Sequence, residues 1–352
     1  MAIDWTRGYT LRMRFLRVDP RTWADSEEVS RVESVTIQRT TGSATQLPCT
    51  ASIDLKTSPA ERFPSGWYRV VAIVRQGRDR ERVDLATVWC ETTGGRLERG
   101  MNSDSVKGRS SLWPCSRCSI PIGSYVPAGY DCARWAADLL RSRTPAPVVL
   151  ADGASFALGV HYVPDVGEMA LGVGLDVLGL GGRTVRERGD GANVVCAEPS
   201  DPSLVLDRMG VRMLTPTISG TLDLSEIPNR YVVRYGGDEY VATNDDPASE
   251  TSTSRRGFVV EKLDTTPKPL DGESLQSYAE RRLEEESSVT DERTYARKWW
   301  PDVMPGDIVR GSLASMGLDG DFRVKSQQVT CGEGGIVVEE RVNREVRTWR
   351  RD

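Results

Sequence analysis

The sequence contains a single histidine, His161, among 352 residues. This scarcity excludes every mechanism that needs two imidazoles, and a mechanism that needs one must use His161. Familiar catalytic and phosphate-binding motifs are also missing: there is no Gly-x-Ser-x-Gly, no His-Glu-x-x-His and no Gly-Lys-Ser/Thr loop. These absences remove much of familiar enzymology, although the spacing of the many Asp and Glu residues does not exclude a carboxylate pair for glycoside hydrolysis.

Long apolar runs are missing as well. A membrane helix needs ~20 apolar residues, whereas the best run, Met169 to Leu180, is shorter and contains Asp176. We therefore expect no integral membrane association. The first residues lack the basic-then-apolar order of a secretory signal, so we expect folding in a reducing cytoplasm with all seven cysteines as thiols.

The charge balance is mildly acidic. Lys and Arg number 46 against 51 Asp and Glu, a formal net charge of −5, so nucleic acid is not expected to be the main ligand. The hydrophobic fraction of 38% and the charged fraction of 28% are those of a globular protein. A chain of this length predicts two or three domains.

The first hundred residues predict a strand meander. In residues 9–18, apolar Leu11, Met13 and Phe15 alternate with Arg12 and Arg14, which is the period of a strand with one buried face. Further strands are predicted at 32–38, 46–55, 67–75 and 82–90, with polar or Gly/Pro turns such as 58–59 between them. This pattern predicts a β-sandwich or a small barrel, with a serine-rich loop near residue 103.

The middle of the chain predicts helices and a hairpin. Asp131 is placed to cap a helix whose apolar residues recur at helical spacing, namely Cys132, Trp135, Ala136, Leu139 and Leu140. A second helix is expected from near Asp165 through Leu178. A hairpin should follow, with its tip at 186–191 and its return strand at 193–197.

Strands return after residue 203. They are predicted at 204–206, 211–214, 231–235, 258–262, 293–300, 307–312, 322–329 and 336–348, with a turn at 332–335. Ser274 or Asp271 is expected to cap a helix over 275–283. Residues 244–257 have no apolar period and predict a long exposed loop.

Four clusters suggest chemistry, and each has a simpler structural interpretation. Cys115 and Cys118 form half of a zinc-ribbon signature, which Cys132 and His161 can complete, although Cys132 also fits the apolar helix face. His161 can act as a general base only beside a nucleophile and a carboxylate, and a structural histidine is the simpler reading. The acidic run 284–286 fits a solvated helix face, and the tripeptide 188–190 fits a hairpin turn better than an adhesion motif.

Three blocks of sequence together resemble a known family. They are the segment 84–89 that closes the meander, the segment 122–129 that leads into the Asp131 helix, and the C-terminal series of helix 275–283, segment 299–308 and segment 320–326. Together they resemble the central hub proteins of phage tails and related contractile injection systems. The loop with Cys115 and Cys118 and the loop 244–257 are not markers of that family.

The resemblance implies a mainly β fold with an α+β middle. It implies two tail-tube-like β-barrel domains, at 1–103 and, with a flanking helix, at 204–352, around a small α/β domain at 104–203. It also implies a homotrimer whose six similar barrels match a hexameric tube ring. The implied partners are that ring, a tape measure protein and a separate tip or spike protein, with DNA only in transit through the channel. The chain ends soon after its last strands, so we expect no fused peptidase or lysozyme.

We therefore expect a structural hub at the virion tail tip, synthesised in the host cytoplasm and without catalytic, cofactor-binding or metal residues. Two alternatives remain open at this point. One is a tail-tip cell-wall hydrolase that uses His161 with nearby carboxylates. The other is a receptor-binding tail module that uses the loop 244–257.

Overall fold

The computed structural model describes residues 3–28, 31–43, 45–57, 64–98, 101–207, 214–221, 224–267, 269, 273–301, 303–332 and 335–349. Its contacts divide the chain into two compact units, residues 1–218 with 294–342 and residues 219–293 with 343–352. The predicted turn at 58–59, the start of the strand at 211–214, the cap Asp271 and residues 333–334 of the turn at 332–335 lie outside the described residues.

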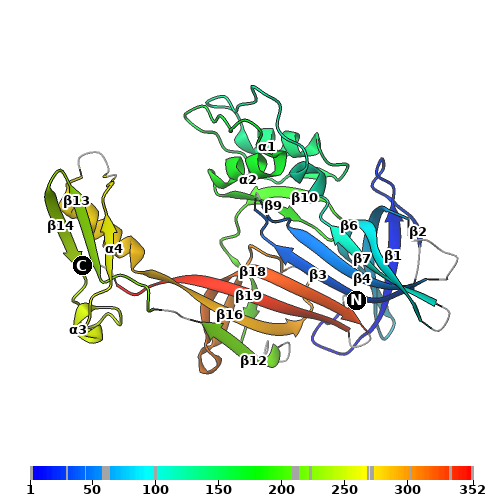
Figure 1. Cartoon of the computed structure of the whole chain (residues 1–352). Helices are drawn as coiled ribbons and strands as arrows, with labels where there is room; N and C mark the ends of the chain where they lie inside the picture. The colour runs from blue at the N-terminus through cyan, green and yellow to red at the C-terminus, as the bar shows by residue number, and fades with distance from the viewer. Residues whose placement is uncertain are drawn as a thin grey trace. The chain divides into compact units, whose positions relative to one another are not determined.

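A sheet of thirteen strands is the main element of the fold, which is mainly β (Figure 1). Its strands are β1 (Thr10–Val18), β2 (Asp25–Glu28), β3 (Arg31–Thr40), β4 (Cys49–Thr57), β5 (Gly66–Gln76), β6 (Asp79–Glu98), β7 (Met101–Arg109), β11 (Pro202–Leu206), β12 (Leu214–Thr221), β16 (Ser288–Lys298), β17 (Ile308–Leu313), β18 (Leu318–Gly332) and β19 (Gly335–Arg347). The strand order is β12-β16-β19-β18-β3-β4-β7-β6-β5-β1-β2, with β17 on β18 and β11 on β17.

The two ends of the sequence meet in this sheet through β3 and β18. These strands are antiparallel, with Ile37 opposite Val329 and Val35 opposite Cys331. In Figure 1 the blue β3 and the orange-red β18 lie side by side. The strand-rich beginning and end of the chain are therefore parts of one continuous sheet.

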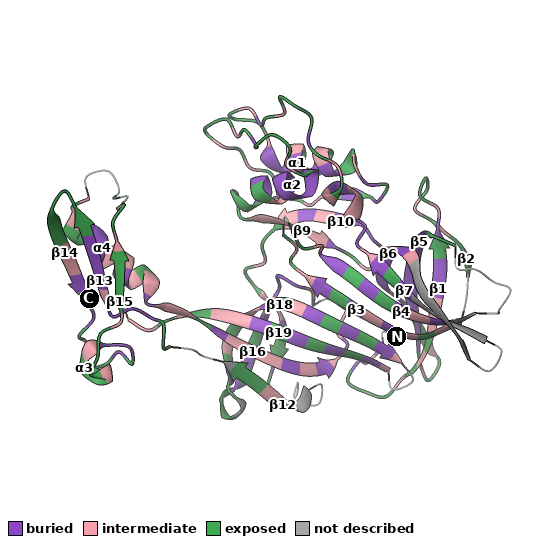
Figure 2. Ribbon diagram, viewed as in Figure 1, coloured by how far each residue is buried: buried purple, intermediate pink, exposed green. Residues whose placement is uncertain are grey.

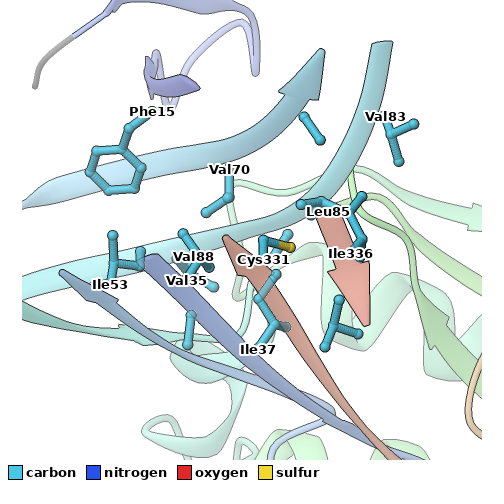
Figure 3. Close-up of a cluster of buried hydrophobic side chains, with 14 of the residues drawn as sticks. Phe15, Val35, Ile37, Ile53, Val70, Val83, Leu85, Val88, Cys331 and Ile336 are labelled. Carbon is cyan, nitrogen blue, oxygen red and sulfur yellow. The ribbon is translucent and has the colours of Figure 1, made fainter. Parts of the chain in front are cut away.

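One apolar core lies against both parts of this sheet (Figure 3). It combines Phe15, Ile53 and Val70 from the N-terminal strands with Cys331 and Ile336 from the C-terminal ones. Strand β5 is buried from Gly66 to Val74 on both faces. Burying a large aliphatic side chain contributes roughly 1.5–3 kcal/mol, so this shared core holds the two parts together.

The predicted strands of the first hundred residues are confirmed, and two more are present. β2 was not predicted, and β7 lies where a serine-rich loop was expected. That expectation was wrong because β7 is polar in sequence, with Val106 as its residue in the apolar core. Its backbone hydrogen bonds to β4 and β6, rather than apolar alternation, hold it in the sheet.

The predicted barrels are not closed in the described part of the chain. The hydrogen-bonded order ends at β12 and at β2, and does not return to its start. The physical reason is that β3 already pairs with β4 on one edge and with β18 on the other, which leaves no edge for β1. Cα atoms of β1 and β3 nevertheless come within 8 Å of each other.

The two helices and the hairpin predicted in the middle of the chain are present, but the second helix begins at Ala170 rather than near Asp165, and an unpredicted strand, Val148–Leu150, adds a third strand to the hairpin. The helices are α1 (Cys132–Arg141) and α2 (Ala170–Gly179), and the sheet β8-β10-β9 consists of β8 (Val148–Leu150), β9 (Arg183–Glu187) and β10 (Asn193–Ala197). A short 3-10 helix precedes them (Trp113–Ser116). Asp131 caps α1 by accepting hydrogen bonds from the N–H groups of Ala133 and Arg134. The helices pack closely at Gly174, where a Cβ would lie 3.3 Å from Leu140 Cδ2.

The second unit has its own small sheet, with the order β14-β13-β15. Its elements are β13 (Arg230–Tyr235), β14 (Asp238–Thr243), α3 (Thr253–Arg256), β15 (Glu261–Asp264) and α4 (Leu275–Glu286), which Ser274 caps as predicted. The loop 244–257 was expected to be exposed, but Asn244, Thr251 and Ser252 are fully buried. Asn244 Nδ2 donates to Ser249 Oγ, and Ser249 Oγ donates to the Thr348 carbonyl. Polar side chains rather than apolar ones therefore form the interior of this loop.

Among the described residues, no helix has the length and apolar character needed to span a bilayer.

Candidate functional site

The tip of the β9–β10 hairpin is fastened to the thirteen-stranded sheet. The carbonyl of Asp190 accepts hydrogen bonds from Trp23 Nε1 at 2.9 Å and from Arg69 Nη2 at 3.0 Å. The carbonyl of Gly189 accepts one from Thr87 Oγ1 at 2.9 Å. These bonds connect the α/β middle of the chain to strands β5 and β6 within one compact unit.

Gly189 permits this close approach. A Cβ at this position would lie 1.7 Å from the carbonyl oxygen of Asp84, so a side chain cannot be accommodated without moving backbone. Gly191 has a φ of +78° and a hypothetical Cβ 2.7 Å from Thr87. Both glycines of the tip are therefore required by geometry.

Arg69 is the charged residue under the tip. Its guanidinium is nearly buried and forms an ion pair with Asp25 at 2.6 Å, and its Nε donates to Thr87 Oγ1 at 3.0 Å. Asp25 also binds Arg82 at 2.7 Å. A charge-assisted network thus holds the tip, β2 and β6 in one arrangement.

The tripeptide 188–190 is the turn of this hairpin, as predicted. Its Arg188 and Asp190 side chains pair with each other at 3.0 Å. The carbonyls of Gly189 and Asp190 are bound to the sheet. The motif therefore serves to attach the hairpin.

A polar pocket of about 670 Å³ lies beside the same tip. Arg39 is almost buried in its wall, donates to the Leu85 carbonyl, and lies 5.3 Å from the centre of the Trp299 ring. Arg186, another lining residue, pairs with Asp307 at 2.5 Å. Because Arg82, Arg186 and Arg188 each have a carboxylate partner in the protein, the pocket presents no cluster of unpaired cations.

The cysteines of the predicted zinc half-site lie in different surroundings. Cys115 is fully buried, its thiol donates to the Leu140 carbonyl, and burial raises its pKa to about 12. Cys132 is also buried and donates to the Tyr130 carbonyl, whereas Cys118 is half-buried. A protonated thiol is a poor zinc ligand. Across the described ranges, no three His, Cys, Asp or Glu residues are grouped closely enough to hold a metal ion.

His161 lies on an exposed loop. Its Nδ1 accepts a hydrogen bond from the Ala128 N–H at 3.2 Å, and the Tyr125 ring packs edge-on with 5.9 Å between ring centres. In the described part of the chain, no hydroxyl, thiol or carboxylate hydrogen-bonds to it. The structure therefore does not bring the histidine and a nucleophile together, and the arrangement is that of a structural histidine.

The acidic run 284–286 forms ion pairs along α4, as a solvated helix face does. Glu285 pairs with Arg281 and with Arg282, and Glu286 pairs with Arg282 and Lys262.

Sequence analysis missed a buried polar network around Glu340. This carboxylate is fully buried and accepts hydrogen bonds from Tyr295 at 2.8 Å, Gln327 at 2.7 Å and Arg297 at 2.5 Å. The available signal was alternation, since Glu340 is in phase with the buried Val338 and Val342. A carboxylate on an apolar strand face needs partners of this kind.

The ends of the sheet are candidate interfaces. β2 is the last strand of the order on one side, and β12 is the last on the other. A strand at a sheet edge presents unpaired N–H and C=O groups that another chain can bind.

No protein-family model matches the sequence, and no curated protein matches it. Solved structures do match. The 43 kDa tail protein of prophage MuSo2 from Shewanella oneidensis matches with a TM-score of 0.59 and 12% identity, over 95% of this chain and 98% of that one. A tail protein from Neisseria meningitidis matches with a TM-score of 0.58 and 18% identity, over 96% of this chain and 97% of that one.

A chain of the Francisella PdpA–VgrG complex also matches, with a TM-score of 0.52 and 5% identity, over 96% of this chain and 58% of that one. The first two likenesses extend over nearly the whole length of both proteins in each pair. The chain therefore has the fold of phage tail proteins, in agreement with the family that its sequence resembles.

Proposed function

We propose that this protein is a structural hub of a phage tail tip or baseplate. The observation that carries the proposal is the end-to-end agreement with two tail proteins, which leaves no large segment of either chain unmatched. The sequence motifs of the hub family support it independently. The role is mechanical, so we propose no catalytic residue, cofactor or metal.

The proposed assembly is a homotrimeric ring that adapts a hexameric tail tube to a threefold tip. In this proposal residues 1–103 and 204–352 supply two tube-like β domains, and 104–203 is an α/β domain between them. The pairing of β3 with β18 supports it, since it joins the two strand-rich parts edge to edge. The approach of β1 to β3 supports a barrel-like curvature of the first part.

The sheet edges would be covered in the ring. Strands β2 and β12 end the sheet, and pairing with neighbouring copies would satisfy their free backbone groups.

The further partners in this proposal are the tube ring, a tape measure protein and a separate tip or spike protein. DNA would pass through the channel only in transit, and the net charge of −5 favours sliding over binding. The protein would be made in the host cytoplasm and end at the virion tail tip.

The test is the mass of the purified full chain by light scattering, followed by electron microscopy. A mass three times the 38.9 kDa of one chain, together with particles that enclose an open bore, is the expected result. A stable monomer across the micromolar range, or a trimer without a bore, would contradict the proposal.

The same preparation tests the two alternatives. Release of peptidoglycan fragments that is lost in His161→Ala would establish a hydrolase instead. Binding to host cells that is lost when the loop 244–257 is altered would establish a receptor-binding module.

A further inference from the structure

Two loops of the α/β middle run side by side and expose apolar side chains. Residues 119–131 and 154–169 are antiparallel, with isolated bridges between Ser119 and Met169 and between Val126 and Tyr162. Val126 and Tyr162 exchange two backbone hydrogen bonds of 2.9 and 3.0 Å. We call the outer side of these two segments the paired-loop surface; Figure 2 shows the loops beside α1 largely in the colour of exposed residues.

Large hydrophobic side chains dominate this surface. Ile122 is 91% exposed, Val166 87%, Val163 71% and Val160 70%, and the rings of Tyr125 and Tyr130 are also exposed. The inward residues of the same segments, such as Ile120 and Val126, already complete the core beneath. The outward ones add nothing to that core. Groups of exposed apolar residues on a folded protein mark interaction sites.

The segments are held in shape by their own contacts. Ile120 N–H donates to the Glu168 carbonyl at 3.0 Å, and Gly129 N–H donates to the Leu158 carbonyl at 2.8 Å. His161 links the two segments through the Ala128 N–H. Because this surface is already ordered, a partner that binds it loses little conformational freedom of the loops.

The charged residues of the two segments themselves are all of one sign, and Arg183 of β9 donates to the carbonyls of Gly153 and Ala154 at one end of them. The segments 118–133 and 144–182 contain no lysine or arginine, in a chain that has 46 of them. They contain five acidic residues, which are Asp131, Asp152, Asp165, Glu168 and Asp176. The pKa of Tyr162 is raised by burial and also by the negative charges of Asp176, Glu168 and Asp165.

One acceptor beneath the surface has no donor among the described residues. Glu168 Oε2 is buried and makes no hydrogen bond within the described residues. A buried carboxylate oxygen without a partner is unfavourable, because it has lost its hydrogen bonds to water. That oxygen is therefore left without a donor just beneath the surface.

We propose that the paired-loop surface binds a basic, apolar segment of a different polypeptide. A second copy of this chain would bring the same carboxylates against them, and like charges in a buried interface are strongly unfavourable. A membrane of anionic lipids would repel them for the same reason. Alternating lysine and large apolar side chains would match both the exposed hydrophobic residues and the carboxylates. The inference does not depend on the proposed hub role.

The test uses the full chain and two fluorescent peptides of 14 residues in fluorescence anisotropy, one alternating leucine with lysine and the other leucine with glutamate. We expect the lysine peptide to bind at least about tenfold more tightly, which corresponds to ~1.4 kcal/mol. Binding should weaken as the salt concentration rises. Ile122→Ser combined with Val166→Ser should weaken it by about tenfold, as should Asp165→Asn combined with Glu168→Gln.

Matched controls are available on the same unit. Val205→Ser removes an apolar side chain on β11 that is 49% exposed, and Glu81→Gln removes a carboxylate from β6; both should leave binding unchanged. Thermal unfolding of each variant checks that the fold is retained.

Two binding results would overturn the inference: equal affinity for the two peptides, or an equal loss of peptide binding in the control variants. It would also be overturned if the protein associated with itself and Ile122→Ser with Val166→Ser abolished that association. Binding of the protein to phosphatidylglycerol vesicles through the same residues would overturn it as well. The hub proposal has a separate readout. Failure to form a threefold ring would leave the peptide result intact, and loss of peptide binding would leave the ring intact.

Discussion

Because Gly189 has no side chain, its backbone can lie against Asp84 of β6, which is distant in sequence. An added methyl group would overlap the Asp84 carbonyl, so the hairpin tip and β6 would have to separate. We predict that Gly189→Ala lowers the free energy of unfolding by roughly 1–3 kcal/mol, as overpacking does. Urea unfolding measures the change.

Gly159→Ala is the matched control for that substitution. Gly159 has no atom within 4 Å of its hypothetical Cβ and lies on a loop of the same unit. Its replacement should change the stability by less than about 0.5 kcal/mol. If the two substitutions changed the free energy of unfolding equally, the close approach of Gly189 to Asp84 would not be the cause of the destabilisation.

The cysteines differ in reactivity because burial differs. Burial raises the pKa of the thiols of Cys49, Cys90, Cys115 and Cys331. Cys118 and Cys196 are both half-buried, but burial raises the pKa of Cys196 as well. With Ellman's reagent at pH 8, we predict that Cys118 reacts first and that the buried thiols react only on unfolding. Cys118→Ser should remove the fast phase and Cys90→Ser should leave it. A fast phase that survives Cys118→Ser would contradict the assignment.

At the scale of single elements, the N-cap of α1 predicts a pH effect. Burial raises the pKa of Asp131, but hydrogen bonds from Arg134 N–H, Ser155 and Ala133 N–H outweigh it, so the pKa lies below 3.8. A lowered pKa in the folded state means that the stabilisation is complete above the unfolded value and is lost as the pH falls through the folded one. Asp131→Ala should therefore be less stable than the natural protein by about 1 kcal/mol at pH 7.

The difference between Asp131→Ala and the natural protein should shrink below pH 3.8. Unfolding curves from pH 7 to pH 3 measure it, with Asp152→Asn, an exposed carboxylate of the same region, as control. A difference that does not change with pH would show that the charge of the cap is unimportant.

Elements with a clear period were predictable from the sequence, and elements without one were not. Helices α1 and α4 have an apolar stripe and a polar cap, so both were found. Strand β7 and the loop 244–257 are built from polar residues whose hydrogen bonds depend on the folded surroundings. Gln327 is in phase with the buried Val329 and Cys331, so its burial was predictable, but its partner Glu340 lies on another strand and was not.

At the scale of the whole molecule, the sheet makes the two ends of the chain interdependent. Val329 on β18 is fully buried in the core shared with β3, whereas Val337 on β19 is 43% exposed. We predict that Val329→Ala lowers stability by ~2 kcal/mol and that Val337→Ala changes it by less than ~0.5 kcal/mol. Hydrogen exchange should become faster in β3 as well as in β18, although the two are distant in sequence.

Faster exchange confined to β17, β18 and β19 would show that the two ends unfold independently.

The pairing of β3 with β18 could not be inferred from the sequence. Alternation indicates which face of a strand is buried, but not which of thirteen strands will be its neighbour. The family resemblance supplied the class of fold, while the attachment of the hairpin tip through Gly189 and Arg69 required coordinates.

The chain leaves the large sheet after β7 and re-enters it at β11, and the residues between form an apolar core of their own beside the attached hairpin tip. Substitutions on the outer loops of this insertion change no strand register in the sheet that carries it. The exposed loops can therefore change in sequence without altering the strands of the large sheet around them.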